Sequence, residues 1–485
     1  MRHAFLSLGL ALTACSGSPG VDGGSGSMDA ATDDAGTAAP DAATPTDASS
    51  ELDASLPGLR ETMAAEGLDT LDGRFEAVDL SMCCEMGRSC SGNNPSSPYL
   101  SFYLPRGPGQ TAPNFDEASD GTSPGFRMRQ DEAVVLVGRT PPDVRYFGFT
   151  PYLLERDYDG TRRVPFASLD ETLNPETIRV EGGPEVYDRP FALVMTGNAT
   201  TEARVRSALV ASGVPDEAIN LVTLDPSVVA FGLDEPADTL SLLARVALFA
   251  DRAAGAAWVT DPGATLLRVT PSTPLAPDPL ASPPARPKDA TVDETRDGLP
   301  AALDRLEAAI RAAHPGDAIR SYPANEGTAD PEACIETGAP CLGDNRDALY
   351  PSLGAEAFTI LNRDSVYVIG VDHVATGKAT YASASVYALS HLVGVAAVTS
   401  EDWSGSAERF LPGDPDASAL FAWRVARDCA GDAYCLEVPT GTCPSGAGLL
   451  QLLTVVFRVY VEPGHATAPD PDLLVRERVL HVRAP

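Results

Sequence analysis

An alternation of apolar and polar positions occurs twice along the chain, and each time it ends at a glycine. The two segments are Glu132-x-Val134-x-Leu136-Val137-Gly138 and Asp364-x-Val366-x-Val368-Ile369-Gly370. A period of two residues is typical of a strand that buries one face. Each segment is followed by another with a tyrosine at either end, namely Tyr146 and Tyr152 in the first and Tyr381 and Tyr387 in the second. We predict that all four segments are strands.

A spaced cysteine motif precedes each of these strand pairs. Its copies are Cys83-x-Glu85-x-Gly87-x-x-Cys90-x-Gly92-x-Asn94-x4-Tyr99 and Cys334-x-Glu336-x-Gly338-x-x-Cys341-x-Gly343-x-Asn345-x4-Tyr350. Seven identities align without a gap. Weaker matches keep the same order, with residues 191–194 against 421–424 and residues 246–251 against 454–459. Because rare residue types seldom align in this way by chance, we interpret the body as an internal duplication.

Apolar spacing also predicts helices. Val205 and Leu209 indicate a helix over residues 200–213, and residues 219–224 read as a returning strand. A helix over residues 299–313 is predicted to open the second copy, and seven prolines between residues 271 and 297 indicate an extended spacer before it. We therefore divide the body into a first half (56–271), a Pro-rich linker (272–298) and a second half (299–485).

The expected fold class follows from these elements. It is α+β, an internally duplicated body of mainly antiparallel strands with a few helices. We expect the two halves to be related by a pseudo-twofold axis and braced by disulfides.

The N-terminus has a basic start, an apolar run over residues 4–12, and then Leu12-Thr13-Ala14-Cys15. This resembles the lipobox of bacterial lipoprotein precursors, which implies removal of residues 1–14 and lipidation of Cys15. A plain secretory signal cleaved near Ala14 is the alternative. Residues 15–55 are rich in Gly, Ser, Ala, Pro, Thr and Asp, which predicts a disordered acidic tether. We expect a protein of the bacterial cell envelope that faces the periplasm or the cell exterior.

Charge narrows the range of partners. The formal net charge is −33, so the basic footprint that nucleic acids require is missing. No segment after the N-terminus is apolar enough to span a bilayer, so we expect membrane contact through the lipid alone. A small molecule or a glycan fits this charge better than an anionic polymer does. The sequence predicts no particular oligomeric state.

Nine cysteines less the lipidated one leave eight, an even number that favours disulfides in an oxidising compartment. Equal spacing in the two motifs favours closing Cys83 with Cys90 and Cys334 with Cys341. Full pairing would then require Cys84 to reach the remaining cluster near the C-terminus and join the halves. That cluster consists of Cys429, Cys435 and Cys443. A zinc site is the alternative, although no C-x-x-C pair or neighbouring histidine completes a tetrahedral set.

One turn differs between the copies. Between its two matched strands the second copy has Asp372-His373-x-x-Thr376-Gly377-Lys378-x-x-Tyr381, whereas the first copy has only residues 139–143, without a histidine. His373 is a candidate general base, and Lys378 is one of two lysines in the chain. Asp372 and Tyr381 would complete a catalytic group. The alternative is a polar turn shaped by Asp372 and the Thr-Gly pair.

Two binding hypotheses arise from the other motifs. Oxygen donors on the cysteine-closed loops suit calcium, with turn chemistry as the alternative, and we otherwise expect no cofactor. The calcium candidates are Glu85, Asn94, Glu336, Asp344 and Asn345. Tyr146, Tyr152 and Tyr387, with Tyr381, could border a ligand groove, unless they pack at the edge of a core.

Catalytic signatures such as G-x-S-x-G, H-E-x-x-H and G-x4-G-K-[ST] are missing from the sequence. The sequence therefore favours a lipid-anchored extracytoplasmic protein with a binding or envelope-structural role. An extracytoplasmic hydrolase centred on His373 and Lys378 is the alternative.

Overall fold

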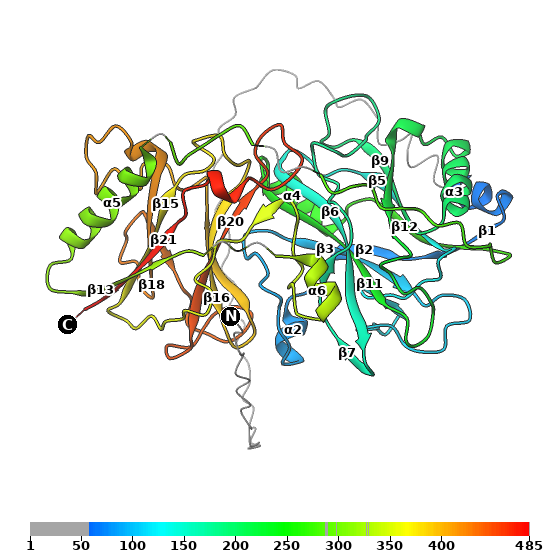
Figure 1. Cartoon of the computed structure of the whole chain (residues 1–485), viewed down its shortest axis with the longest axis horizontal. Coiled ribbons are helices and arrows are strands. Elements are labelled where there is room, and N and C mark those ends of the chain that lie inside the picture. The colour runs from blue at the N-terminus through cyan, green and yellow to red at the C-terminus, as the bar shows by residue number, and fades with distance from the viewer. Residues whose placement is uncertain (1–57, 287–289, 297, 326, 328, 485) are drawn as a thin grey trace, which may run out of the picture. The chain divides into compact units, whose positions relative to one another are not determined.

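The structure is a computed structural model that describes residues 58–286, 290–296, 298–325, 327 and 329–484, all of them within one compact unit. The lipobox and the predicted tether lie outside the described residues. Four sheets, mostly antiparallel, make up the body (Figure 1). The predicted fold class, α+β with mainly antiparallel strands and few helices, is confirmed.

The first half contains two sheets. The strands of the outer sheet, in spatial order, are β1 (Leu68–Asp72), β12 (Thr265–Pro271), β5 (Ala133–Arg139), β9 (Pro190–Thr196) and β10 (Ile219–Thr223). The strands of the inner sheet are β2 (Arg74–Ala77), β3 (Tyr99–Pro105), β11 (Thr239–Phe249), β6 (Val144–Tyr158) and β7 (Thr161–Arg163), with β4 (Thr122–Ser123) and β8 (Ala167–Ser168) at its margins.

The second half repeats this arrangement with fewer strands. Its outer sheet has the order β13 (Ala318–Pro323), β21 (Arg478–Arg483), β15 (Ser365–Val371), β18 (Leu420–Ala426) and β19 (Cys435–Glu437). Its inner sheet has the order β14 (Ala348–Leu349), β20 (Leu453–Tyr460), β16 (Ala382–Ala388) and β17 (Val393–Thr399). In both outer sheets the last pair of strands is parallel, and the other pairs are antiparallel. Duplication is our interpretation of this match in strand order.

Apolar side chains fill two layers in each half. One layer lies between the two sheets, and the other lies between the outer sheet and its helices. Helix α3 (Ala199–Ala211) covers the outer sheet of the first half and α5 (Leu299–Ala313) that of the second (Figure 1). Both helices were predicted, and Leu303, Leu306 and Ile310 of α5 are completely buried.

The shorter helices have local causes. Residues 58–65 are helical, with Leu59 and Met63 buried at the start of the first half. Helix α4 (Arg252–Thr260) was not predicted, and it begins where the Asp251 side chain accepts hydrogen bonds from two backbone amides. The cysteine motifs form α2 (Ser81–Glu85) and α6 (Pro331–Thr337). Among the described residues, no helix has the length and apolarity needed to cross a membrane.

The Pro-rich linker has no helix or strand over its described residues 272–286 and is mostly exposed there, as predicted for an extended spacer, but it is hydrogen-bonded to the body. Asn198 donates a hydrogen bond to the carbonyl of Ala276, and the amide of Ala199 donates one to the carbonyl of Asp278. Glu294, near the end of the linker, is buried in the second half. These hydrogen bonds and the burial of Glu294 hold the spacer to both halves.

Candidate functional site

Each cysteine loop docks on the inner sheet of the opposite half. The amide of Cys90 donates to the carbonyl of His391 over 2.6 Å, and the amide of Cys341 donates to the carbonyl of Pro165 over 2.7 Å. Arg458 donates to the carbonyl of Gly92, and Arg245 donates to that of Gly343, both over 2.6 Å. These contacts are reciprocal, so each half completes the other.

The four tyrosines of the predicted groove lie inside this interface. The hydroxyl of Tyr146 accepts a hydrogen bond from Asn345 over 2.8 Å, and that of Tyr381 accepts one from Asn94 over 2.9 Å. Tyr152 donates to the carbonyl of Asp344, and Tyr387 donates to that of Asn93. All four rings are at most 1% exposed. Tyr146, Tyr152 and Tyr387 therefore do not border an open groove; their hydroxyls are used by the opposite loop.

The calcium candidates are not gathered into one ligand set. Glu85 and Glu336 are exposed on α2 and α6. The carboxylate of Asp344 accepts hydrogen bonds from the amide and the hydroxyl of Ser168. The side-chain oxygens of Asn94 and Asn345 likewise accept hydrogen bonds from the protein, so the observed geometry is that of turn and docking contacts.

His373 is buried between two carboxylates. Its Nδ1 lies 2.9 Å from Glu294 of the linker, and its Nε2 lies 3.3 Å from Glu477. Burial alone would lower the pKa of His373, but the negative charges and hydrogen bonds of both glutamates raise it to about 10. The imidazole is therefore positively charged at neutral pH. This corrects its assignment as a general base, because a general base must be free to accept a proton and reach a substrate.

Lys378 is also completely buried, and it holds the linker. Its Nζ donates to the carbonyl of Val292 over 2.7 Å and lies 3.1 Å from Glu462. Asp372 accepts hydrogen bonds from the amides of Val374 and Ala375, which shapes the turn. Burial raises the pKa of Asp372 above its usual value. The four predicted catalytic residues thus do not converge on a common space, since Tyr381 points to the loop of the first half.

The turn that His373 and Lys378 fix forms one wall of a cleft between the halves. This space, called the inter-half cleft below, has a volume of about 400 Å³. The second half contributes Val374, Ala379, Thr380, Glu401 and Pro463, and the first half contributes Asp143, Val144, Arg145, Tyr187, Leu248 and Ala250. The first-half turn over residues 139–143, equivalent to the His373 turn, therefore reaches the same cleft from the other side.

Polar and apolar side chains from both halves line the inter-half cleft. Nε of Arg145 lies 3.7 Å from the carboxylate of Glu401, an ion pair that joins the halves, and the side chains are 63% and 38% exposed. Asp143 is exposed beside them. The ring of Tyr187 packs edge-on against Phe147, with centroids 6.1 Å apart. Burial, followed by the charge of Asp143, raises the pKa of Tyr187, so its hydroxyl keeps its proton at neutral pH.

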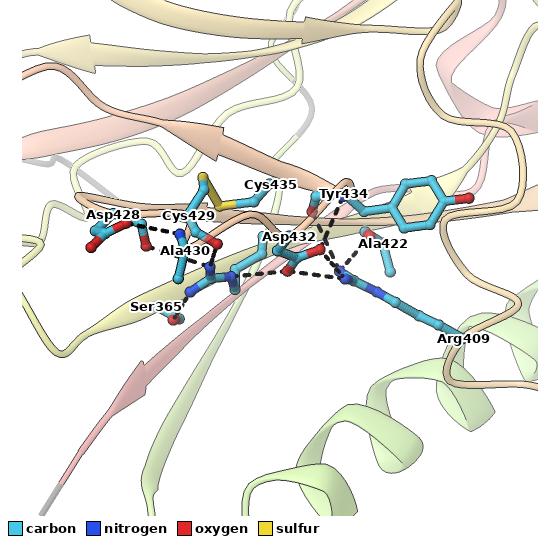
Figure 2. Close-up of a disulfide and its surroundings, with 10 residues drawn as sticks. Ser365, Arg409, Ala422, Asp428, Cys429, Ala430, Asp432, Tyr434 and Cys435 are labelled. Carbon is cyan, nitrogen blue, oxygen red and sulfur yellow. Dashed lines mark hydrogen bonds and ion pairs between the residues drawn. A yellow bond between two sulfur atoms is a disulfide. The ribbon is translucent and has the colours of Figure 1, made fainter.

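Four disulfides close the cysteines of the described chain. The pairs are Cys83–Cys90, Cys334–Cys341, Cys429–Cys435 and Cys84–Cys443. The sulfurs of Cys83, Cys84 and Cys90 lie close enough to hold a metal, but all three are bonded in disulfides. Figure 2 shows the loop of Cys429 and Cys435, whose Asp432 binds Arg409 and also accepts a hydrogen bond from Arg424.

Comparisons with known proteins give no family. No protein-family model matches the chain, and no curated protein does. Among solved structures, an uncharacterised protein from Burkholderia cenocepacia is 13% identical, with a TM-score of 0.41 and 91% of each chain covered. A protein from Vibrio parahaemolyticus is 9% identical, with a TM-score of 0.37, and the match covers 88% of this chain and 97% of the Vibrio chain. Neither name states an activity.

Several residues of the inter-half cleft were not singled out from the sequence. Arg145 is the one with a visible signal, because it is the single charged residue in the mostly apolar segment 144–154 of β6. Tyr187 and Glu401 lie in loops without a motif. The partners of His373 and Lys378, Glu294, Glu477 and Glu462, were missed as well.

Proposed function

We propose that the protein is a lipid-anchored, extracytoplasmic binding protein of the bacterial cell envelope, with its ligand site in the inter-half cleft. The observation that carries the proposal is the cleft itself, a space of about 400 Å³ lined by both polar and apolar groups from the two halves. Spaces of this size and composition suit small ligands. Four disulfides support an oxidising compartment.

The chemistry of the cleft suits a small, neutral, hydroxyl-rich ligand such as a saccharide. The ring of Tyr187 would contact an apolar face of the ligand. The carboxylates of Asp143 and Glu401 would accept hydrogen bonds from the ligand hydroxyls, and the guanidinium of Arg145 would donate hydrogen bonds to them. Two carboxylates and a net charge of −33 act against anionic ligands. A hydrolase centred on His373 and Lys378 is not favoured, since both side chains are buried and bound to carboxylates.

Ligand binding is tested by calorimetry and thermal shift with neutral mono- and disaccharides, a polyamine, an anionic disaccharide and Ca²⁺. We expect a neutral saccharide to bind and Tyr187→Ala to weaken its affinity roughly tenfold, about 1.4 kcal/mol. Tyr103→Ala is the matched control, because Tyr103 is also half-buried but is not part of the cleft. Equal loss in both variants would contradict the site, and no response to any compound would leave the envelope-structural role.

Lipid attachment is tested separately. The wild-type precursor, expressed in bacteria with a labelled fatty acid, is expected to incorporate label and to partition into detergent, whereas Cys15→Ser should do neither. Mass spectrometry of the mature N-terminus gives a second readout. An unmodified N-terminus near Ala14 in the wild type would instead support the plain secretory signal.

A further inference from the structure

Two disulfides adjoin each other at the docked cysteine loop of the first half. Cys83 and Cys84 are neighbours on α2, and they belong to different disulfides, Cys83–Cys90 and Cys84–Cys443. The sulfur of Cys84 lies only 3.9 Å from that of Cys90, to which it is not bonded. The sulfurs of Cys83, Cys84 and Cys90 all lie within 4.8 Å of one another. A thiolate released from Cys84 would therefore face a disulfide at contact distance.

The two disulfides differ in how many of their cysteines are accessible, since Cys83 of the Cys83–Cys90 bond is partly exposed but its partner is not. Cys84 and Cys443 are both partly exposed, whereas Cys90 is 7% exposed and packs in the core of the second half. An external thiolate can therefore approach either sulfur of Cys84–Cys443, and its approach to Cys90 is hindered. Accessibility is one of the factors that decide which disulfide a thiol attacks.

The second cysteine loop provides a comparison within the same molecule. Its disulfide, Cys334–Cys341, has the same spacing of seven residues as Cys83–Cys90. Ile335 stands where the first loop has Cys84, and it packs against the core of the first half. The third sulfur is therefore not needed to close such a loop or to dock it on the opposite half.

We propose that Cys83, Cys84, Cys90 and Cys443 form a thiol–disulfide exchange site that reacts with dithiol reductants, such as a dithiol oxidoreductase of the envelope. One reductant thiolate attacks the sulfur of Cys443, so that a mixed disulfide forms and Cys84 leaves as a thiolate. The second reductant thiol closes the reductant disulfide and releases Cys443 as a thiol. In this step the reductant loses two electrons and the Cys84–Cys443 bond gains them.

The following step is internal and transfers no net electrons. The Cys84 thiolate attacks the sulfur of Cys90, the Cys84–Cys90 bond forms, the Cys83–Cys90 bond breaks, and Cys83 leaves as a thiolate. The loop thus remains closed by one disulfide while the link to Cys443, which spans 359 residues, is open. Oxidation by the reverse sequence restores the original pairs.

Limited reduction of the intact protein tests this proposal. The wild type is treated with substoichiometric dithiothreitol, quenched with acid, alkylated, and mapped by mass spectrometry. We expect the alkylating reagent on Cys443 and on a second thiol that is divided between Cys84 and Cys83. A peptide linked by a Cys84–Cys90 disulfide should also be present. Label confined to Cys84 and Cys443 would overturn the exchange step. Reduction that starts at Cys334–Cys341 or Cys429–Cys435 would overturn the assignment of the reactive site.

A variant tests the internal step without any reductant. Cys443→Ser leaves Cys84 unpaired, so we expect its thiol label to divide between Cys84 and Cys83, with Cys84–Cys90 and Cys83–Cys90 peptides both found. Ile335→Cys is the matched variant in the second loop, and exchange with Cys334–Cys341 there would show that a third neighbouring sulfur is sufficient. If Cys83 stays unlabelled in Cys443→Ser, the proposal is wrong.

Discussion

Replacing His373 with alanine is expected to lower the free energy of unfolding by about 3–5 kcal/mol, the usual cost of removing one partner from a buried ion pair. The imidazole is completely buried, and it touches Glu294 on one side and Glu477 on the other. Without the imidazole, the two buried carboxylates would repel each other and would have few other hydrogen-bond donors. Glu294 would retain hydrogen bonds from Thr376 and from the amide of Val475.

Urea unfolding of the wild type and His373→Ala measures this effect, with His314→Ala as the control. His314 also contacts a carboxylate, that of Asp317, but it is partly exposed, so its loss should cost no more than about 1 kcal/mol. Similar losses in the two variants would contradict the role of the buried network. The His373 turn is also a wall of the inter-half cleft, so ligand binding should weaken together with stability.

The pH dependence of this difference gives a second check. The pKa of His373 rises from 6.5 in the unfolded chain to about 10 in the folded protein. A raised folded pKa means that the stabilisation is complete below pH 6.5 and is lost as the pH rises through about 10. The difference between the wild type and His373→Ala should therefore narrow in alkali, and a difference independent of pH would argue against a charged imidazole.

The elements that the sequence predicted are those with a local signal. Helix α5 follows from the spacing of Leu303, Leu306 and Ile310, and the strands β5 and β15 follow from alternation that ends at glycine. The loop disulfides follow from the equal spacing of the two motifs. All of these features depend on residues close together in the chain.

The sequence alignment of the two copies was wrong in one pair of long apolar strands, β11 and β20. The match of residues 246–251 to 454–459 is out of register, because in the structure Arg245 lies opposite Gly148 and Arg458 lies opposite Ser383. These positions are equivalent once Tyr146 is aligned with Tyr381. Strands of small and branched apolar residues can be aligned with one another at several offsets. The sequence alone therefore does not select the alignment in which Arg245 and Arg458, which each dock a loop, are equivalent.

The environment of the candidate site depends on contacts that are distant in sequence. His373 meets Glu294 and Glu477 across 79 and 104 residues, and no local pattern connects them. The tyrosine spacing correctly indicates one face of each strand, but not that a loop from the opposite half covers this face. A polar residue in a turn therefore looked accessible in the sequence, although the fold buries it.

A second buried carboxylate, Asp347, is expected to have the opposite effect on stability. It lies between the halves, completely buried, and its Oδ2 accepts hydrogen bonds from Tyr146 and Asn174, each over 2.9 Å. Burial raises the pKa of Asp347 from 3.8 to about 7, although these hydrogen bonds and the charge of Arg286 act in the other direction and Glu171 adds to the rise. His373 contacts groups of opposite charge, whereas the contacts of Asp347 among the described residues are with the uncharged groups of Tyr146 and Asn174.

The sign of the pH effect follows from this shift. The folded protein holds the proton of Asp347 more tightly than the unfolded chain does, so stability falls as the pH rises from 3.8 to about 7 and is then constant with respect to this group. Asp347→Asn keeps an oxygen that can accept from Tyr146 and Asn174 but cannot ionise. We expect it to raise the free energy of unfolding at pH 8 by on the order of 2–4 kcal/mol, and to change it little near pH 4.

Urea unfolding of the wild type and Asp347→Asn at both pH values measures the effect. Asp159→Asn is the control, because Asp159 is an exposed residue in the turn between β6 and β7, and its replacement should change the free energy of unfolding by no more than about 0.5 kcal/mol at either pH. If Asp347→Asn destabilises the protein at pH 8, the attraction of the ionised Asp347 to Arg286 outweighs the cost of burying its charge. The folded pKa of Asp347 would then lie below 3.8, so raising the pH to 3.8 would tighten the interface between the halves, and raising it through 7 would not loosen it.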